Sequence, residues 1–146
     1  MKPLTQRSFL LSDIPAALAL WRETPGIGLN ESDTPEALTI FLQRNPGFSR
    51  VVEDGGEIVA AVLCGHDGRR GYLHHLAVRD SHRGRGIGRS LVDACLGHLQ
   101  RFGLPKCTIM VFDHNGDGEA FWRKHDWQER TELKVLQRRL TVEQVA

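Results

Sequence analysis

The sequence predicts one α/β (α+β) domain over residues 1–146, with a mixed, mostly antiparallel central sheet of six to seven strands flanked by about four helices. Three runs rich in β-branched and aromatic residues follow one another between residues 48 and 78, separated by Asp-Gly turn signals. An amphipathic helix pattern from Ile87 and a further buried strand come next, which is the order of a strand-helix-strand crossover. A chain of this length can bury one proper core.

The N-terminal third predicts one strand and two helices. Residues 5–10 have the composition of a strand, and Ser12 or Asp13 caps a helix that ends before Pro25. The second helix is capped by Thr34, has a proline as its first residue and ends at an Asn-Pro pair. The segment between the two helices is therefore expected to be a loop, and it is rich in Gly, Asp and Glu.

The central part predicts a three-stranded antiparallel meander followed by a long helix. Residues 48–54, 56–66 and 70–78 form the strands of the meander. Apolar residues then recur at steps of four and three, at Ile87, Leu91, Cys95, Leu99 and Phe102. One face of this helix is therefore apolar, and Gly103 ends the helix.

The C-terminal part predicts two more strands and a short helix. The segment 107–112, "CTIMVF", follows a crossover helix and is expected to lie parallel to residues 71–78 through a right-handed connection. A helix from Glu119 to Lys124 and a last strand at 133–140 complete the domain. Because an edge strand can pair with a second copy, we expect a monomer or a homodimer.

Composition indicates an ordinary globular protein. The formal net charge is +1, so we expect no broad nucleic-acid-binding surface. The cysteines Cys64, Cys95 and Cys107 form no CxxC pair and lie in apolar segments, which predicts buried, reduced thiols. Charges and prolines interrupt the apolar runs of the N-terminus, so we expect neither a signal peptide nor a membrane span, and a cytoplasmic protein with no membrane partner.

The stretch "HHLAVRDSHRGRGIGRSL", residues 74–91, indicates an anion site. Glycines at Gly84, Gly86 and Gly88 permit positive φ and let backbone amides approach a ligand. The helix behind them supplies unpaired N–H groups and a positive dipole end. Planar donors suited to phosphate oxygens stand in the same stretch, at Arg83, Arg85 and Arg89.

Two common phosphate motifs do not fit this loop. A dinucleotide fingerprint GxGxxG that starts at Gly84 or Gly86 would need its third glycine where Arg89 or Leu91 stands. A P-loop requires GxxxxGK followed by Ser or Thr, and no lysine stands near Gly88. From the loop alone, a tight strand-to-helix turn with solvated arginines stays open as an alternative.

With its surroundings, the loop resembles the pyrophosphate loop of the GNAT superfamily of acetyl-CoA-dependent N-acetyltransferases. The family pattern Arg/Gln-x-x-Gly-x-Gly/Ala is matched in "RGRGIG", and the preceding strand ends in "LAV". The family's downstream "Asn…Ala-x-x-aromatic" element is expected at Asn115 to Trp122, where the match is looser. The resemblance covers nearly the whole chain. Among family members, the chain is most similar to small stand-alone bacterial proteins such as ribosomal-protein alanine acetyltransferases. The resemblance implies acetyl-CoA as cofactor and an amine as acceptor.

The resemblance also implies where coenzyme A binds. Strands 71–78 and 107–112 diverge in this family and admit the pantetheine arm along the first strand, while the loop amides hold the pyrophosphate. The cofactor-binding residues expected on this basis are Leu76, Ala77, Val78, Arg83, Gly84, Arg85, Gly86, Ile87, Gly88, Arg89, Ser90, Asn115 and Trp122.

The catalytic residues expected from the sequence are His74 and Tyr72. Strand alternation places Tyr72, His74, Leu76 and Val78 on one face and His75 on the other. The resemblance implies a base here, because arylalkylamine acetyltransferases have a histidine where His74 stands. Neutral imidazole, with an ordinary pKa of about 6.5, can accept a proton directly or through a water. A histidine hydrogen-bonded within the sheet is the open alternative, and the separated histidines make a metal site unexpected.

The chain departs from the family in "NGDGEAFWRKHDW". Trp122 stands where the family usually has a tyrosine that acts as general acid, and Asp126 replaces a glycine. An indole N–H donates a hydrogen bond but does not give up its proton. We therefore expect slower chemistry, with Trp122 packed against the cofactor or the core. A catalytically weak acyl-CoA-binding regulatory or sensor module is the alternative function.

By resemblance, the acceptor site is lined by residues 21–38. Trp21 and Glu23 are the expected substrate contacts, and the acidic side chains of this segment favour a cationic amine, although a solvated loop explains the same charges. The expected partner is a small-molecule amine or a protein amine, with no nucleic acid.

Overall fold

The computed structural model describes residues 4–140 of the chain. Its five strands form one sheet in the order β1-β2-β3-β4-β5. The strands are β1 Thr5–Ser8, β2 Arg50–Asp54, β3 Glu57–His66, β4 Gly71–Val78 and β5 Cys107–Thr108. Neighbouring strands pair antiparallel, except that β4 and β5 pair parallel as expected. The mixed, mostly antiparallel sheet is confirmed, with five strands in the described residues where six to seven were expected.

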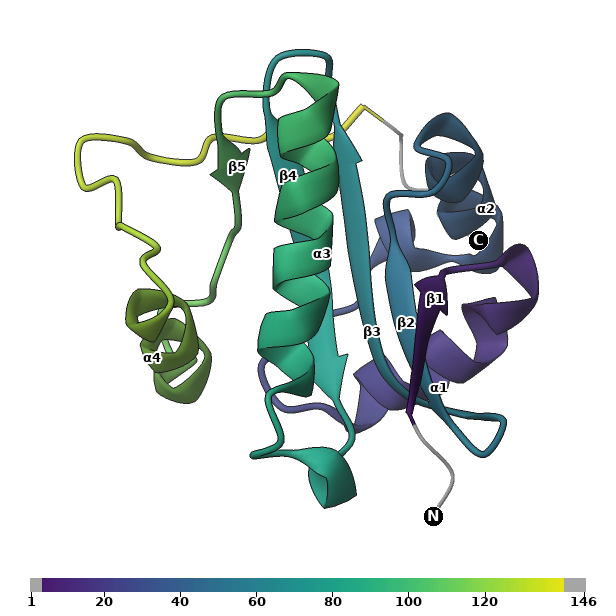
Figure 1. The fold of residues 1–146 in the computed structure, drawn as a ribbon. Helices are drawn as coiled ribbons and strands as arrows, with labels where there is room; N and C mark the ends of the chain where they lie inside the picture. Colours follow the sequence, from purple (N-terminus) through teal and green to yellow (C-terminus); the bar gives the residue numbers. More distant parts are fainter. Residues whose placement is uncertain (1–3, 141–146) are drawn as a thin grey trace, which may run out of the picture.

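Four α-helices flank the sheet, as predicted, and Figure 1 shows α3 lying along the length of β4. The helices are α1 Ile14–Glu23, α2 Pro35–Arg44, α3 Ile87–Phe102 and α4 Gly116–Lys124. Three short 3-10 helices connect them, η1 Leu11–Asp13, η2 Glu31–Asp33 and η3 Asp80–His82. No helix within residues 4–140 has the length and hydropathy that crossing a bilayer requires.

Local chemistry favours the start of α2 and the end of α3. Thr34 caps α2, because its Oγ1 accepts a hydrogen bond from the N–H of Ala37 over 3.1 Å. The apolar face of α3 is buried, with Leu91 at 0% exposure and Leu99 at 3%. Gly103 follows α3 with φ +97°, a left-handed conformation that glycine adopts without strain.

Two apolar cores lie on opposite faces of the sheet. The first packs α1 and α2 against β3 and β4, and it includes Trp21 and Leu38. The second packs α3 against β2, β3 and β4, and it includes all the buried side chains of α3. The three cysteines belong to this second core, where burial and contact with Cys95 raise the pKa of the Cys107 thiol to about 12. The cysteines are free thiols, as expected.

The sequence prediction was wrong for the last strand and for the length of the preceding one. Residues 133–140 form no strand, and their apolar side chains Leu136 and Leu140 are 91% and 92% exposed. The segment 107–112 is a strand only over its first two residues. Alternating apolar residues form a strand only where a neighbouring strand offers hydrogen bonds in register, and β5 pairs with β4 over two residues only.

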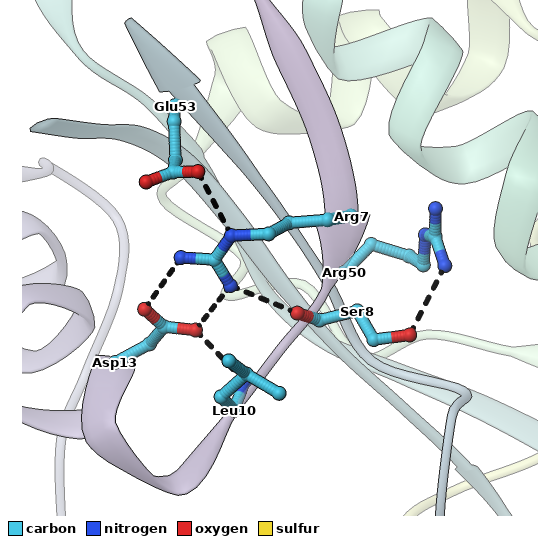
Figure 2. A network of polar contacts seen from close by, with 6 residues as sticks. All are labelled: Arg7, Ser8, Leu10, Asp13, Arg50 and Glu53. Carbon is cyan, nitrogen blue, oxygen red and sulfur yellow. Dashed lines mark hydrogen bonds and ion pairs between the residues drawn. The ribbon is translucent and has the colours of Figure 1, made fainter. Parts of the chain in front are cut away.

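A charged network ties the start of α1 to the sheet (Figure 2). The guanidinium of Arg7 on β1 donates two hydrogen bonds to the Asp13 carboxylate, at 2.7 and 2.9 Å, and one to Glu53 at 2.9 Å. The N–H of Leu10 also donates to Asp13. The bond from Arg7, aided by that from Leu10, holds the pKa of Asp13 below its ordinary value, although burial opposes the shift.

Replacing Asp13→Asn is expected to destabilise the fold by about 2 kcal/mol at pH 7, because charge-assisted hydrogen bonds to Arg7 are lost. Since the folded pKa of Asp13 lies below its unfolded value, this stabilisation is present above about pH 4 and is lost as the pH falls further. Urea unfolding should therefore show that the free energy of unfolding falls more between pH 7 and pH 3 in the wild type than in the Asp13→Asn variant. Asp93→Asn, at an exposed position of α3, is the control. The prediction would be contradicted if the wild type and Asp13→Asn lost the same amount of stability on acidification.

Candidate active site

β4 and β5 separate soon after they pair. The parallel pairing joins Gly71–Tyr72 to Cys107–Thr108 and ends there. From residue 73 onward the edge of β4 that faces β5 has no strand partner among the described residues. Backbone N–H and C=O groups along such an edge need other hydrogen-bond partners. This open edge runs past Leu76, Ala77 and Val78.

β4 carries a bulge at His75. Between the pairs Ala61–Ala77 and Leu63–His74, β3 has one residue and β4 has two. His75 has φ +56°, in the left-handed region that a non-glycine residue adopts only at a cost. The extra residue re-aims the side chains that follow it along the strand.

The bulge overturns the expected alternation of side chains on β4. His74 contacts an aromatic ring of α2, and His75 contacts one of α1, so both histidines lie on the face that these helices cover. Leu76 and Val78 instead pack with the core beneath α3. The period of two is interrupted by one inserted residue, a feature that single-sequence alternation cannot reveal. The two histidines therefore lie on the same face of β4.

His74 lies in an aromatic environment. Its ring centroid is 6.0 Å from that of Phe41, edge to face, and 6.3 Å from that of Tyr72, with nearly parallel planes. Burial lowers the pKa of His74, and the nearby His75 lowers it further, while Asp33 acts in the opposite direction. His74 is therefore neutral at pH 7 and available as a proton acceptor.

His75 is held by a buried carboxylate. Its Nε2 lies 2.8 Å from Oδ1 of Asp33, whose side chain is 6% exposed. The other oxygen of Asp33 accepts the N–H of Asn30 over 3.0 Å and closes the turn of η2. On its other side the His75 ring lies 5.2 Å from the ring of Trp21. Sequence reasoning placed Asp33 only in an acidic loop and missed this pair, because the contact spans 42 residues of sequence.

The glycine-arginine loop leads into the N-terminus of α3. Gly84 and Gly86 have φ of +79° and +77°, and a Cβ at either position would meet no atom of the described residues within 4 Å. Gly86 precedes Ile87, the first residue of α3, and no side chain caps the helix. The first amides of α3 are therefore available to a ligand, together with the positive end of the helix dipole. Such a site suits an anion.

Three exposed guanidinium groups surround this helix start. Arg83 donates to the carbonyl of Val78 over 3.2 Å and pairs with Asp80 at 2.9 Å, which ties the loop to the end of β4. Arg89 pairs loosely with Asp93 at 3.8 Å. Arg85 forms no ion pair with any residue between 4 and 140. The next side chain of α3, Ser90, accepts a hydrogen bond from Gln6.

Asn115 and Trp122 lie on α4 and its cap. Oδ1 of Asn115 accepts the N–H of Gly118 and begins the helix. A Cβ on Gly26 would clash with the Asn115 side chain, so the loop after α1 touches the segment after β5. The ring of Trp122 packs edge to face against Trp127, with centroids 5.0 Å apart. The structure brings Trp122 into an aromatic cluster attached to the α3 core.

The two expected acceptor contacts differ in exposure. Glu23, at the end of α1, is exposed. Trp21 is fully buried, between the rings of Phe9 and His75. No group of three potential metal ligands comes together in the described part of the chain.

Similar proteins share this architecture. A solved N-acetyltransferase, PaiA from Thermoplasma acidophilum in complex with coenzyme A, is similar with a TM-score of 0.75 and 16% identity, covering 85% of this chain and 89% of that one. A predicted acetyltransferase from Clostridium acetobutylicum with acetyl-CoA is similar with a TM-score of 0.74 and 17% identity, covering 92% and 96%.

Relatives closer in sequence lead to the same family. An acetyltransferase of Sodalis glossinidius is 31% identical over 139 residues, which is 94% of this chain and 96% of that protein. An acetyltransferase of Photorhabdus laumondii is 30% identical over 143 residues, with the same coverage. The acetyltransferase (GNAT) family profile matches residues 14–127, which include the loop, the bulged strand and α4. The chain therefore belongs to the acetyltransferase (GNAT) family.

Proposed function

We propose that the protein transfers the acetyl group of acetyl-CoA to a primary amine by direct attack of the amine on the thioester. The observation that carries the proposal is the junction of the open β4 edge with the uncapped, glycine-rich start of α3. A ligand with an amide-containing arm and a pyrophosphate matches a strand edge beside an anion site. Family membership supports the reaction, and the solved relatives with coenzyme A or acetyl-CoA support the cofactor.

The residues at this junction fit coenzyme A. The open space at Gly84 and Gly86 lets phosphate oxygens approach the backbone, where a Cβ would stand in the way. The proposed contacts are backbone groups of Leu76, Ala77 and Val78 for the arm, amides of residues 84–90 for the pyrophosphate, the guanidinium groups of Arg83, Arg85 and Arg89, and the side chains of Asn115 and Trp122.

Attack on the thioester requires an amine without its extra proton. His74 is the proposed proton acceptor, because its lowered pKa leaves it neutral at pH 7 and its ring lies on the face of α1 and α2. Tyr72, stacked beside it, is a poor base with an ordinary pKa of about 10, and it orients water or substrate.

Trp122 limits the rate without abolishing the reaction. Its indole cannot protonate the departing thiolate. If the thiol of coenzyme A has the ordinary pKa of a cysteine thiol, about 8.5, its release as a thiolate at pH 7 costs about 2 kcal/mol more than its release as a protonated thiol. The presence of Trp122 where the family usually has a tyrosine also favours the second candidate function, an acyl-CoA-binding sensor. Steady release of CoA thiol with a panel of amines supports the transferase, and binding without release supports the sensor.

The proposed acceptor is a small-molecule amine or a protein amine, taken up by a monomer or a homodimer. Glu23 is exposed and available to a cationic amine, whereas buried Trp21 reaches the site through its contact with His75. The relatives' names specify no acceptor class for this chain.

Thermal unfolding with and without acetyl-CoA tests the cofactor. A ligand at 100 times its dissociation constant adds about 2.7 kcal/mol of stability, so we expect the melting temperature to rise by several degrees. ATP and NAD are the controls, since they carry phosphates but no pantetheine arm. A folded protein that gains no stability from acetyl-CoA would contradict the proposal.

A further inference from the structure

The ion pair of Asp33 and His75 has the features of a positioned base. Its two side chains are 6% and 18% exposed, and the carboxylate is fixed by a second hydrogen bond from Asn30. The imidazole is confined between this carboxylate and the Trp21 ring, with centroids 5.2 Å apart. A base whose ring is oriented by a carboxylate has its free nitrogen held in one direction.

The pair also determines which nitrogen is free. A carboxylate accepts hydrogen bonds only, so Nε2 of His75 carries the proton in this contact and Nδ1 has the lone pair. Nδ1 forms no hydrogen bond with residues 4–140. The unpartnered side-chain atoms of the same range that are fully buried are Nε1 of Trp21 and Nε of Arg50, so Nδ1 of His75 retains some exposure to solvent. A proton can therefore reach it from the site.

His74 and His75 compete for one proton. Their ring centroids are 6.4 Å apart, so a positive charge on one disfavours a charge on the other. His74 lies among the rings of Phe41 and Tyr72, whereas His75 touches a carboxylate. The charged groups that face His75 from the surrounding elements are Asp33 on η2 and, when protonated, His74 on β4. Of the two rings, only that of His75 lies within hydrogen-bond distance of the Asp33 carboxylate, which is placed to compensate a positive charge there.

We propose that the proton lost by the acceptor amine comes to rest on Nδ1 of His75, directly or by way of His74, and that Asp33 is the positioning residue for this step. The inference rests on the proposed acetyl transfer. The ammonium N–H bond breaks, its electron pair stays on nitrogen, and Nδ1–H forms. The nitrogen pair then forms the bond to the acetyl carbon while the C–S bond breaks and its pair leaves on sulfur. The acetylated nitrogen loses its second excess proton to solvent, which leaves a neutral amide and a thiolate. The negative charge of Asp33 compensates the positive charge of the His75 imidazolium, which then releases its proton to solvent.

Asp33→Asn and His75→Asn are the test variants. Asn at position 33 keeps an oxygen for the N–H of Asn30, but its amide can donate to Nε2, which moves the proton to Nδ1. Asn at position 75 tolerates the left-handed backbone better than most residues. At saturating acetyl-CoA, with any amine that supports turnover, we expect kcat to fall about 100-fold or more in both variants. Because the charge of Asp33 raises the pKa of the neighbouring His74, we expect the low-pH limb of the kcat profile to move to lower pH in Asp33→Asn.

A second His-Asp pair in the same chain provides the matched control. Nε2 of His82 lies 2.7 Å from Oδ2 of Asp54, and Asp54→Asn breaks this contact outside the bulged strand. We expect Asp54→Asn to keep kcat and the pH profile, and all variants to keep the stabilisation by acetyl-CoA. Unchanged kcat and pH profile in Asp33→Asn and His75→Asn would overturn the inference. Activity lost in His74→Ala but intact in His75→Asn would also overturn it, and would leave acetyl transfer standing.

Discussion

Gly86→Ala is expected to weaken acetyl-CoA binding at least about tenfold, which corresponds to one charge-assisted hydrogen bond of about 1.5 kcal/mol or more. Gly86 has φ +77° and lies at the start of α3, where a Cβ would project into space free of protein atoms. In the proposed complex the pyrophosphate approaches the backbone there. A Cβ at this position and any relaxation of φ both move amides away from the phosphate oxygens.

Gly56→Ala is the matched control for this variant. Gly56, in the turn between β2 and β3, has φ +89° and equally open surroundings. Both substitutions therefore carry the same backbone penalty, about 1 kcal/mol. Titration of acetyl-CoA by calorimetry should separate them, with weaker binding in Gly86→Ala only. Equal affinities in the two variants would show that the loop does not hold the phosphates.

Trp21→Ala is expected to lower the free energy of unfolding by about 3–5 kcal/mol, because a fully buried indole is replaced by a cavity. Trp21 packs against Phe9 in the core and supports the ring of His75. Its Nε1 is buried and has no hydrogen-bond partner among residues 4–140, so Trp21→Phe removes an unsatisfied donor and should cost less stability. Urea unfolding measures both differences.

Phe102→Ala serves as the control for Trp21→Ala, because this aromatic residue of α3 is 59% exposed. Its loss of stability should be well below that of Trp21→Ala. A loss below about 1 kcal/mol for Trp21→Ala would mean that the indole is not part of the core, and would make direct contact with the acceptor the better account of Trp21.

Local signals in the sequence predicted most of the fold. Thr34 caps α2, the apolar face of α3 is buried up to Leu99, and segment 107–112 begins as a strand parallel to β4. Each of these depends on neighbours in sequence or on a crossover rule. The strand expected at 133–140 failed because a strand depends on a distant partner in register, and short-range alternation cannot supply one.

The sequence by itself determined the α/β fold class, the family resemblance and the glycine-arginine turn at the start of α3, because glycine spacing, helix termini and apolar periodicity act over a few residues. Only the tertiary structure decided how the side chains of the candidate site are arranged. One inserted residue at His75 turned two histidines to the same side of β4, and folding brought Asp33 from a distant loop to one of them. Bulges and long-range ion pairs depend on how strands and loops meet in space, which local sequence patterns do not encode.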